Sequence, residues 1–273
     1  MANKFSLKLK KLFSWYLINY NTLYYISRYK RSEYTSHNYD DYWKNRMEKE
    51  FHFSGDKEFI EGPGVSGGKL EQKILLLLSV KYKRVRILSS LIEPGSSVLD
   101  IGCGRGEVLK YLKKTNNIKG FGIDVSSYAI ESLGKEGINV QCCDINDDDS
   151  IKAIVGEYDY VLVTSVIEHI PRPENLLNLI KGKIKKKLIV GIPNSGYYQE
   201  RLRLLFGKFP MQWTEHPADH LRFWTLRDFK WWIGWTGDYR IVKIIPDWGT
   251  PILKNILPSL FARSIFFVLE PKS

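Results

Sequence analysis

Short apolar runs alternate with segments of helical periodicity from residue 69 to the end of the chain. An apolar run of about four to eight residues between turn-forming residues is typical of a buried strand, whereas apolar residues at every third or fourth position indicate a helix. Their alternation predicts an α/β fold with a doubly wound, mostly parallel sheet. The expected strands are 98–103, 120–125, 140–145, 158–166, 187–193, 240–246 and 265–270.

The first expected strand runs directly into three glycines at alternate positions, Gly102, Gly104 and Gly106. Helical spacing resumes at Glu107, so the glycines lie where a strand ends and a helix begins. Backbone N–H groups and the positive end of a helix dipole meet there without Cβ atoms, which favours an anionic ligand group. The order differs from the G-x-G-x-x-G of dinucleotide-binding folds, because Glu107 stands where the last glycine would be.

Acidic residues stand at the ends of the next two expected strands, Asp124 on the second and Asp144 on the third. Ligands of open α/β sheets bind beyond the carboxyl ends of the strands, so both residues are candidates for ligand binding. A carboxylate at Asp124 can accept both hydrogen bonds of a ribose diol. The alternative is a helix cap, a role for which Ser126 and Asp147 are also suited.

The fourth expected strand ends in the sequence S-V-I-E-H-I-P, which begins at Ser165 and contains Glu168 and His169. An imidazole titrates near neutral pH, so His169 is suited to remove the proton of a hydroxyl nucleophile. The alternative is that Glu168 and His169 orient the loop or pair with each other.

These motifs resemble those of a known family. The pattern D-x-G-x-G-x-G from Asp100 resembles the first motif of the class I S-adenosylmethionine-dependent methyltransferases, and S-V-I-E-H-I-P is typical of their small-molecule group. Residues 188–210 and 220–229 resemble the MetW-type methyltransferase-like proteins and related glycan-cluster methyltransferases. The likeness covers roughly residues 98–272 and implies a Rossmann-like sheet of seven strands with an antiparallel last strand.

The resemblance also implies S-adenosyl-L-methionine as the cofactor. The glycine turn would lie against its methionyl part, Asp124 on the ribose, and Asp144 with the Ile145 backbone at the adenine. The expected cofactor-binding residues are Asp100, Gly102, Cys103, Gly104, Gly106, Asp124, Val125, Asp144, Ile145 and Ser165, and the expected catalytic residues are His169, Glu168 and His220. Similar O-methyltransferases of ubiquinone synthesis bind a metal through E-x-x-E-H, but Ser165 replaces the first glutamate here, so we expect no metal.

The expected methyltransferase domain spans residues 69–273, with a lid inserted at about 195–224. Four polar residues of that lid, His216, Asp219, His220 and Arg222, either meet the substrate or form a salt-bridged clasp. Thr225 is expected to cap the following helix. A helix over residues 69–92 is expected to lead into the first strand.

Residues 1–68 differ from this domain and are expected to form a basic, aromatic helical extension or lid. The first 31 residues carry seven Lys or Arg and no acid. A helix over residues 4–20 would separate its aromatic residues from its lysines, the pattern of an interfacial anchor on anionic lipid. Packing on the chain's own domain, or against another subunit, is the alternative.

The composition limits the partners and the cellular setting of the chain but does not indicate a function. The net charge of +11 permits a membrane surface, a nucleic acid or an acidic substrate as partner, and chooses none of them. Three cysteines in irregular spacing do not suggest a disulfide framework, which favours a reducing, cytoplasmic setting. No apolar run is long enough to span a bilayer.

Three functions follow from the sequence in decreasing order. The first is a methyltransferase acting on an oxygen of a small molecule, a glycan or a lipid-linked sugar. The second is a MetW-like partner protein that keeps the fold and supports another enzyme, such as a homoserine acyltransferase. The third is RNA methylation, which only the charge suggests. The chain lacks an Asn-Pro-Pro-aromatic motif suited to flipped bases, so a nucleic-acid partner is not expected.

Overall fold

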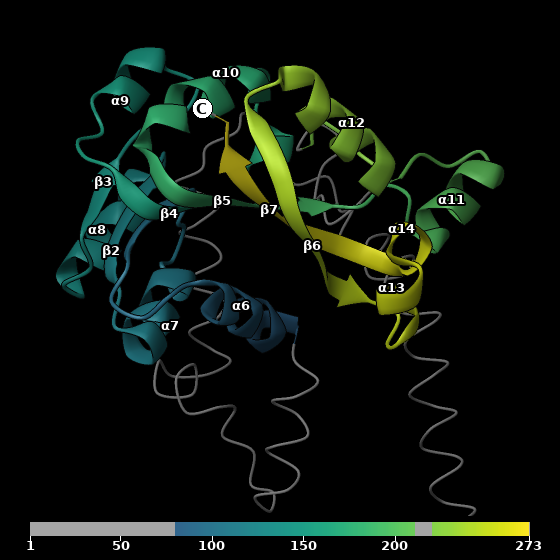
Figure 1. Ribbon diagram of the computed structural model, residues 1–273, viewed down its shortest axis with the longest axis horizontal. Helices are drawn as coiled ribbons and strands as arrows, with labels where there is room; N and C mark the ends of the chain where they lie inside the picture. Colours follow the sequence, from purple (N-terminus) through teal and green to yellow (C-terminus); the bar gives the residue numbers. More distant parts are fainter. Residues whose placement is uncertain (1–79, 211–219, 273) are drawn as a thin grey trace, which may run out of the picture. The chain divides into compact units, whose positions relative to one another are not determined.

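The computed structural model describes residues 80–210 and 220–272 (Figure 1). These residues form a seven-stranded sheet in the order β3-β2-β1-β4-β5-β7-β6. All neighbouring strands from β3 to β5 are parallel, and β7 runs antiparallel to both β5 and β6. The strands are β1 (Ser97–Ile101), β2 (Lys119–Asp124), β3 (Val140–Cys142), β4 (Tyr158–Thr164), β5 (Ile184–Pro193), β6 (Tyr239–Gly249) and β7 (Ala262–Pro271).

The sheet confirms the expected fold class, the seven strands and the antiparallel last strand. Four strand boundaries lie three residues from their expected positions. β6 ends at Gly249 and β7 begins at Ala262, so both strands are longer than expected. β3 ends at Cys142, three residues early, because Asp144 forms a turn in which its Oδ1 accepts the Asn146 backbone N–H at 2.9 Å. β5 begins at Ile184, three residues before the expected start, so the polar run Lys185–Lys187 belongs to the strand itself.

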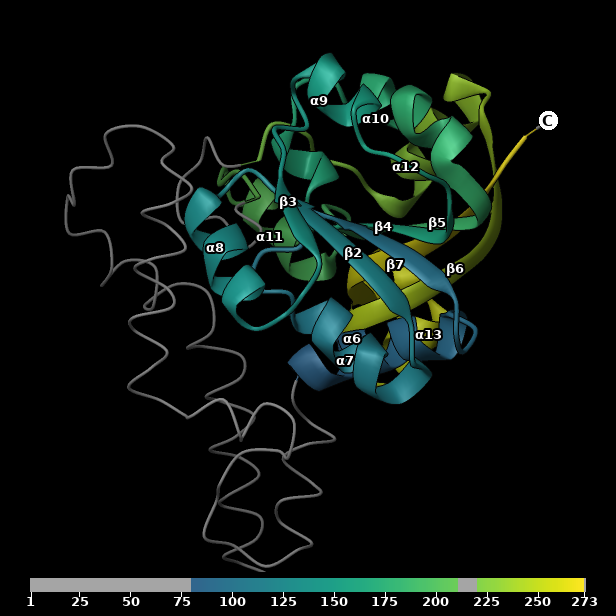
Figure 2. The same ribbon diagram turned by 90° about the vertical axis from the view of Figure 1, so that its left-hand side faces the viewer.

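Helices cover both faces of the sheet (Figures 1 and 2). Leucines of α6, α7 and α8 pack on one face, and apolar side chains of α9, α10 and α12 pack on the other. The helices are α6 (Val80–Leu91), α7 (Glu107–Asn116), α8 (Ser127–Lys135), α9 (Asp148–Lys152), α10 (Pro173–Ile180), α11 (Tyr198–Leu205), α12 (Leu226–Thr236), α13 (Leu253–Ile256) and α14 (Pro258–Phe261), with 3-10 turns η2 (Ile167–His169) and η3 (Lys181–Lys183).

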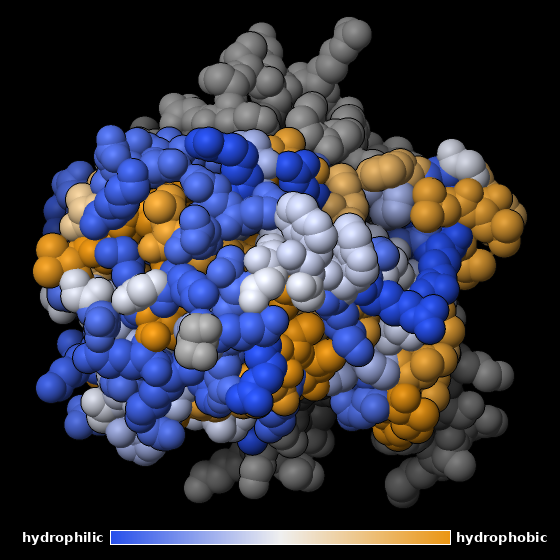
Figure 3. Space-filling view, turned by 45° about the horizontal axis from the view of Figure 1, so that its top comes forward, coloured by the Kyte–Doolittle hydropathy of each residue, from blue (hydrophilic) through white to orange (hydrophobic). Residues whose placement is uncertain are grey.

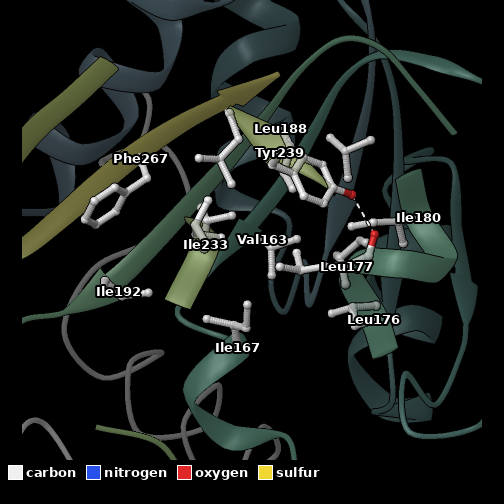
Figure 4. Close-up of a cluster of buried hydrophobic side chains, with 14 of the residues drawn as sticks. Val163, Ile167, Leu176, Leu177, Ile180, Leu188, Ile192, Ile233, Tyr239 and Phe267 are labelled. Carbon is white, nitrogen blue, oxygen red and sulfur yellow. Dashed lines mark hydrogen bonds between the residues drawn. The ribbon is translucent and has the colours of Figure 1, made fainter. Parts of the chain in front are cut away.

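The core on the α10 and α12 face is continuous from β4 to β7 (Figure 4). Val163, Leu188 and Phe267 come from three strands of the sheet, and all three are buried. Tyr239 is also buried, and its hydroxyl donates a hydrogen bond to the Leu177 carbonyl on α10. This bond satisfies the one polar atom of the Tyr239 side chain within an apolar cluster.

Two expected helices are partly or wholly described. α6 contains the second half of the helix expected over 69–92, and its residues Val85 and Leu88 are buried. Thr225 caps α12 as predicted: its Oγ1 accepts the Asp228 N–H at 3.2 Å, and the Asp228 carboxylate accepts the Thr225 N–H at 3.2 Å. This reciprocal pair is a capping box.

The expected extension at 1–68, with its anchor helix, lies outside the described residues, as do His216 and Asp219. Within residues 80–210 and 220–272, none of the helices combines the length and the apolar character needed to cross a bilayer.

Exposed apolar side chains gather near α11 and α13, at one side of the face shown in Figure 3. Leu205 and Phe206 end α11, and Ile252 and Ile256 border α13; each is more than two-thirds exposed. Most of the remaining surface in this view is hydrophilic.

Candidate functional site

The three glycines of the turn after β1 all have left-handed backbones, with φ of 72° at Gly102, 50° at Gly104 and 65° at Gly106. Residues other than glycine rarely adopt this conformation. A Cβ at Gly102 would also lie 2.3 Å from Cγ2 of Val166. The turn therefore requires glycine for its backbone shape and for its contact with the segment after β4.

The turn is fastened to β2 by hydrogen bonds. The N–H groups of Gly102 and Cys103 both donate to the Ile123 carbonyl, at 2.8 and 2.9 Å. The Gly104 N–H donates to Oδ2 of Asp124 at 2.8 Å, and the Ser126 N–H donates to Oδ1 of the same residue at 3.0 Å. Asp124 thus holds the end of β2 against the glycine turn.

Asp124 is 7% exposed, whereas Val125 beside it is 39% exposed. The helix cap of α8 is Ser126, whose hydroxyl accepts the Ala129 N–H at 3.2 Å. The capping alternative for Asp124 is therefore wrong, and its role toward a ribose stays a prediction.

Asp144 and Ile145 follow the carboxyl end of β3, which is parallel to β2. Asp144 is exposed, and its Oδ1 accepts hydrogen bonds from the backbone and side-chain nitrogens of Asn146. Ile145 is half-buried. Asp147, not Asp144, caps α9 through bonds to the Asp149 and Ser150 N–H groups. The adenine role of Asp144 also stays a prediction.

Asp100 and Arg84 place opposite charges beneath the glycine turn. Asp100 is 2% exposed, and burial raises the pKa of its carboxyl to about 7, with the Asp124 carboxylate raising it further and the Arg84 guanidinium lowering it. Arg84 donates through Nη2 to Oγ of Ser165 at 2.9 Å. Ser165 has a left-handed backbone with φ of 57° at the end of β4.

Sequence reasoning missed Arg84, although a signal was present. Arg84 lies four residues before the fully buried Leu88 on α6, so helical spacing puts the arginine on the face that packs against the sheet. A charged residue at a core position is unusual unless it meets a partner or a ligand. Its guanidinium carbon lies 5.4 Å from the ring centroid of Phe266 on β7.

Cys103 is the one expected cofactor-binding residue whose side chain is committed to packing. Its Sγ would be 2.8 Å from a Cβ at Gly122, so the thiol fills the space that Gly122 leaves open. Burial raises the pKa of this thiol, which removes it as a nucleophile at neutral pH. Only its backbone is available to a ligand.

A second cluster lies at the end of β4, the strand that pairs with β1. Glu168 and His169 belong to η2, and His220 comes from a distant part of the chain. Nε2 of His169 lies 4.0 Å from Oε1 of Glu168, and the rings of His169 and His220 are edge to face with centroids 4.6 Å apart. The structure therefore unites the three residues that the sequence nominated for catalysis.

Backbone hydrogen bonds place His220 in this cluster. The N–H groups of Leu221 and Arg222 donate to the Glu168 carbonyl at 2.8 and 3.1 Å. The Arg222 guanidinium also donates to the Pro171 carbonyl. Arg222 consequently fixes the segment after His220 to the loop after η2. The sequence predicted a salt-bridged clasp, but Arg222 makes this contact with a backbone carbonyl rather than with a carboxylate.

Burial distinguishes the three members. Glu168 is 1% and His220 is 4% exposed, whereas the His169 side chain is 29% exposed. Desolvation raises the pKa of the Glu168 carboxyl, and the same cause, with the nearby His169, lowers the pKa of His220 to about 3. His220 is thus neutral at physiological pH, and His169 is the member that solvent reaches.

The two ends of segment 195–224 lie side by side. The Ser195 N–H donates to the Trp224 carbonyl at 2.9 Å, and Asn194 and Trp224 form an isolated parallel bridge. Asn194 is fully buried, and its Nδ2 donates to the Ala262 carbonyl at 2.6 Å. Because the two ends of this segment pair, the part of the chain before Trp224 lies beside η2. His220 therefore reaches Glu168 although it is distant in the sequence.

The fold and the glycine turn place the chain in a structural class. The described residues have the fold of a class I S-adenosylmethionine-dependent methyltransferase. A SAM-dependent methyltransferase structure from Archaeoglobus fulgidus matches with a TM-score of 0.53 and 22% sequence identity, over 76% of this chain and 100% of that one. The fold predicted from the motifs is confirmed.

The family follows from the sequence match. The profile of the family described as methionine biosynthesis protein MetW matches residues 83–238, more than half of the chain, so the chain belongs to the MetW family. It is 26% identical over 157 residues to a bifunctional methionine biosynthesis protein MetXA/MetW of Rhodopirellula baltica, covering 51% of this chain and 24% of that protein.

A second curated relative is a probable tRNA methyltransferase 9B of Mus musculus, 31% identical over 105 residues that cover 38% of this chain. The match covers 22% of the mouse protein. The chain therefore spans about a quarter of the length of the curated relatives that it matches.

Proposed function

We propose that this chain is an S-adenosylmethionine-dependent methyltransferase that methylates an oxygen of a small molecule or of a glycan intermediate. One observation carries the proposal: the glycine turn and the Glu168–His169–His220 cluster lie at the carboxyl ends of the adjacent strands β1 and β4. The turn offers backbone for a cofactor, and the cluster offers a partly exposed imidazole for a nucleophile. Cofactor and acceptor would then meet beyond the carboxyl ends of these two strands.

The charges beneath the turn fit the amino-acid tail of the cofactor. That tail carries one carboxylate and one ammonium group. Arg84, held toward the end of β4 by its bond to Ser165, would pair with the carboxylate, and the buried Asp100 would pair with the ammonium. The pairing with the ammonium group would offset part of the cost of burying the Asp100 carboxylate.

The remaining proposed contacts with the cofactor lie beyond the carboxyl ends of β2 and β3. The Asp124 carboxylate would accept the ribose hydroxyls, and Val125 with Ile145 would offer apolar surface to the adenine. Asp144 would reach the polar edge of that base. Segment 195–224 would act as a lid over the cleft, and residues 69–273 would form the methyltransferase domain.

S-adenosylmethionine, when bound, supplies an electrophilic methyl group on a sulfonium sulfur. His169 would remove the proton of the acceptor hydroxyl as the oxygen attacks. The Glu168 carboxylate, 4.0 Å away, would stabilise the resulting imidazolium, and the edge of His220 would fix the plane of the His169 ring. Most of the rate would come from alignment, because in-line displacement needs no covalent help from the protein.

The test is a calorimetric titration with S-adenosylhomocysteine, followed by methyl transfer from radiolabelled cofactor to fractionated metabolites and lipid-linked sugars. The proposal expects binding of one molecule per chain and label in a fraction that contains a hydroxyl acceptor. Absence of cofactor binding by a folded sample would end the enzyme interpretation.

Family membership supports a second candidate. A relative named as a methionine biosynthesis protein favours a role in which the chain keeps the fold and supports another enzyme. This candidate predicts a stable complex with a second enzyme of methionine biosynthesis, and no transfer to any acceptor fraction. Methyl transfer catalysed by the purified chain alone would exclude it.

The likeness to a probable tRNA methyltransferase supports RNA as a third acceptor class, to be added to the same radiolabel assay. For residues 1–31 the proposal is peripheral contact with anionic lipid at the cytoplasmic face of a membrane. Removing residues 1–30 should release the chain from sedimenting anionic vesicles. A full-length chain that never sediments with them would contradict the contact.

A further inference from the structure

Two buried polar atoms of the cluster have no hydrogen-bond partner within the described part of the chain. They are Oε2 of Glu168 and Nδ1 of His220. A buried carboxylate or imidazole nitrogen is normally paired, because leaving it unpaired forfeits the hydrogen bonds it made to water. The nearby Arg84 guanidinium donates to Ser165. Both atoms are therefore positioned for a partner other than the described residues, and a bound cation is one such partner.

We propose that Glu168, His169 and His220 bind a divalent transition-metal cation. One ligand atom from each residue lies within 4.8 Å of the others. This proposal revises the expectation of no metal, which rested on Ser165 standing where a glutamate would be. It deepens the proposed function at the same site, and only its catalytic consequence rests on that function.

The donor set selects the class of cation. Two imidazoles and one carboxylate suit zinc, cobalt, nickel, manganese or iron in the divalent state, whereas magnesium and calcium prefer oxygen ligands alone. Three protein ligands leave a coordination position open, as in catalytic rather than structural zinc sites. The part-exposed His169 marks the side from which the cation and a further ligand would enter.

The backbone has already assembled the site. Leu221 and Arg222 donate to the Glu168 carbonyl, so the His220 segment is held on η2 without help from a cation. Donor atoms around zinc at about 2.1 Å lie roughly 3.4 Å apart in a tetrahedron. The observed spacing of up to 4.8 Å is wider, so the side chains would have to move closer together on binding a cation.

The bound cation would change how the acceptor is activated. A cation held by Glu168, His169 and His220 would supply Lewis acidity toward the acceptor oxygen, and His169 would then act as a ligand rather than as a base. The acceptor proton would pass to solvent, its oxygen would bond to the methyl carbon, and the carbon–sulfur bond would break with both electrons passing to sulfur. The sulfonium becomes a thioether, so the charges balance without an oxidant or a reductant.

The experiment measures metal binding directly in the full-length chain. The protein is stripped with a chelator, dialysed and titrated with zinc by calorimetry, and cobalt is followed by its visible absorption. We expect one zinc per chain. Glu168→Gln and His220→Ala should each weaken binding by at least about a hundredfold, since loss of a mere supporting contact costs tenfold to a hundredfold. Asp149→Asn, an exposed carboxylate paired with Lys152 on α9, is the control and should bind zinc like the unaltered chain.

Glu168→Gln keeps the shape of the side chain and removes a buried charge, so this variant tests the site even where His220→Ala fails to fold. Equal zinc affinity in Glu168→Gln and in the unaltered chain would overturn the proposal, as would the absence of binding. S-adenosylhomocysteine is titrated into the same samples. Cofactor binding without zinc binding refutes the metal site alone, and zinc binding without cofactor binding refutes the proposed function alone.

Discussion

The glycine turn after β1 and the cluster after β4 lie on neighbouring strands but are built in opposite ways. In the turn, the backbone N–H groups and the Asp124 carboxylate bond to one another, and the strained conformations are carried by glycines. In the cluster, two buried side-chain atoms have no partner within residues 80–210 and 220–272. The hydrogen bonds of the turn are made among the described residues, whereas the cluster holds two buried atoms that are not paired with any of them.

This difference separates two ways in which a site can fail. A change in the turn alters the backbone and should remove the cofactor from its place. A change in the cluster leaves that backbone intact and should affect turnover first. Four substitutions test this separation.

Gly104→Val is expected to have the largest effect, which is loss of measurable cofactor binding. Valine is strongly disfavoured at φ of 50°, so the turn must move and the N–H bond to Asp124 is lost with it. Calorimetry with S-adenosylhomocysteine measures the loss, and circular dichroism checks the fold. Gly134→Ala is the matched control, because a Cβ there meets nothing within 4 Å. Unchanged affinity in Gly104→Val would detach the turn from cofactor binding.

His169→Ala should lower turnover by roughly a hundredfold to ten-thousandfold, the usual range for removal of a proton-transfer group, with little effect on cofactor affinity. The physical reason is that His169 belongs to the cluster after β4, where the acceptor is proposed to bind, and not to the glycine turn after β1. Radiolabel transfer to the acceptor fraction gives turnover, and calorimetry gives affinity. An equal loss of both quantities would reassign His169 to a structural role.

Asp100→Asn should stabilise the chain without cofactor by about 1 to 3 kcal/mol near pH 8, because it removes a buried charge at an unfavourable position. The folded carboxyl has a pKa of about 7 against an ordinary value of 3.8. Between those values the unfolded chain releases the proton first, so the stability of the parent chain falls as pH rises through this window.

Urea unfolding at several pH values measures this effect. The Asn variant should lose the part of the pH dependence that lies between about pH 4 and 7. The same variant should bind S-adenosylhomocysteine more weakly, since Asp100 is proposed to meet the ammonium group. A variant that is less stable than the parent at pH 8 would contradict the assignment of an unfavourable buried charge.

Thr225→Ala should have the smallest effect, a loss of about 1 kcal/mol in the free energy of unfolding. The substitution removes the hydroxyl of the capping box that starts α12, directly after the segment that carries His220. Thr236→Ala, at the other end of α12 where the hydroxyl donates to the Ile233 carbonyl, serves as the comparison. Thermal unfolding should separate the two variants, and equal stability would show that the cap contributes nothing.

The sheet and the glycine turn were accessible from the sequence because both are local. Strand periodicity is read within one segment, and the need for glycine follows from the backbone of five consecutive residues. The boundaries of β3 and β5 were less accessible. At β3 the Asp144 side chain competes for the backbone of the next turn, and at β5 lysines extend a strand that hydropathy alone would start later.

The cluster required the tertiary structure. The sequence nominated the neighbours Glu168 and His169, and His220 separately. That His220 meets them depends on the bridge between Asn194 and Trp224 and on the bonds from Leu221 and Arg222 to the Glu168 carbonyl. Arg84 was overlooked because its hydrogen bond to Ser165 joins a helix to the end of a strand that is distant in the sequence.

The sequence by itself thus determined the family, the strand order along the chain and the turn after β1, since these depend on local conformational preference and on burial. Only the tertiary structure decided which charged and imidazole groups meet at the end of β4. Their meeting depends on long-range backbone pairing, and a pairing between distant segments leaves no period or spacing in the sequence.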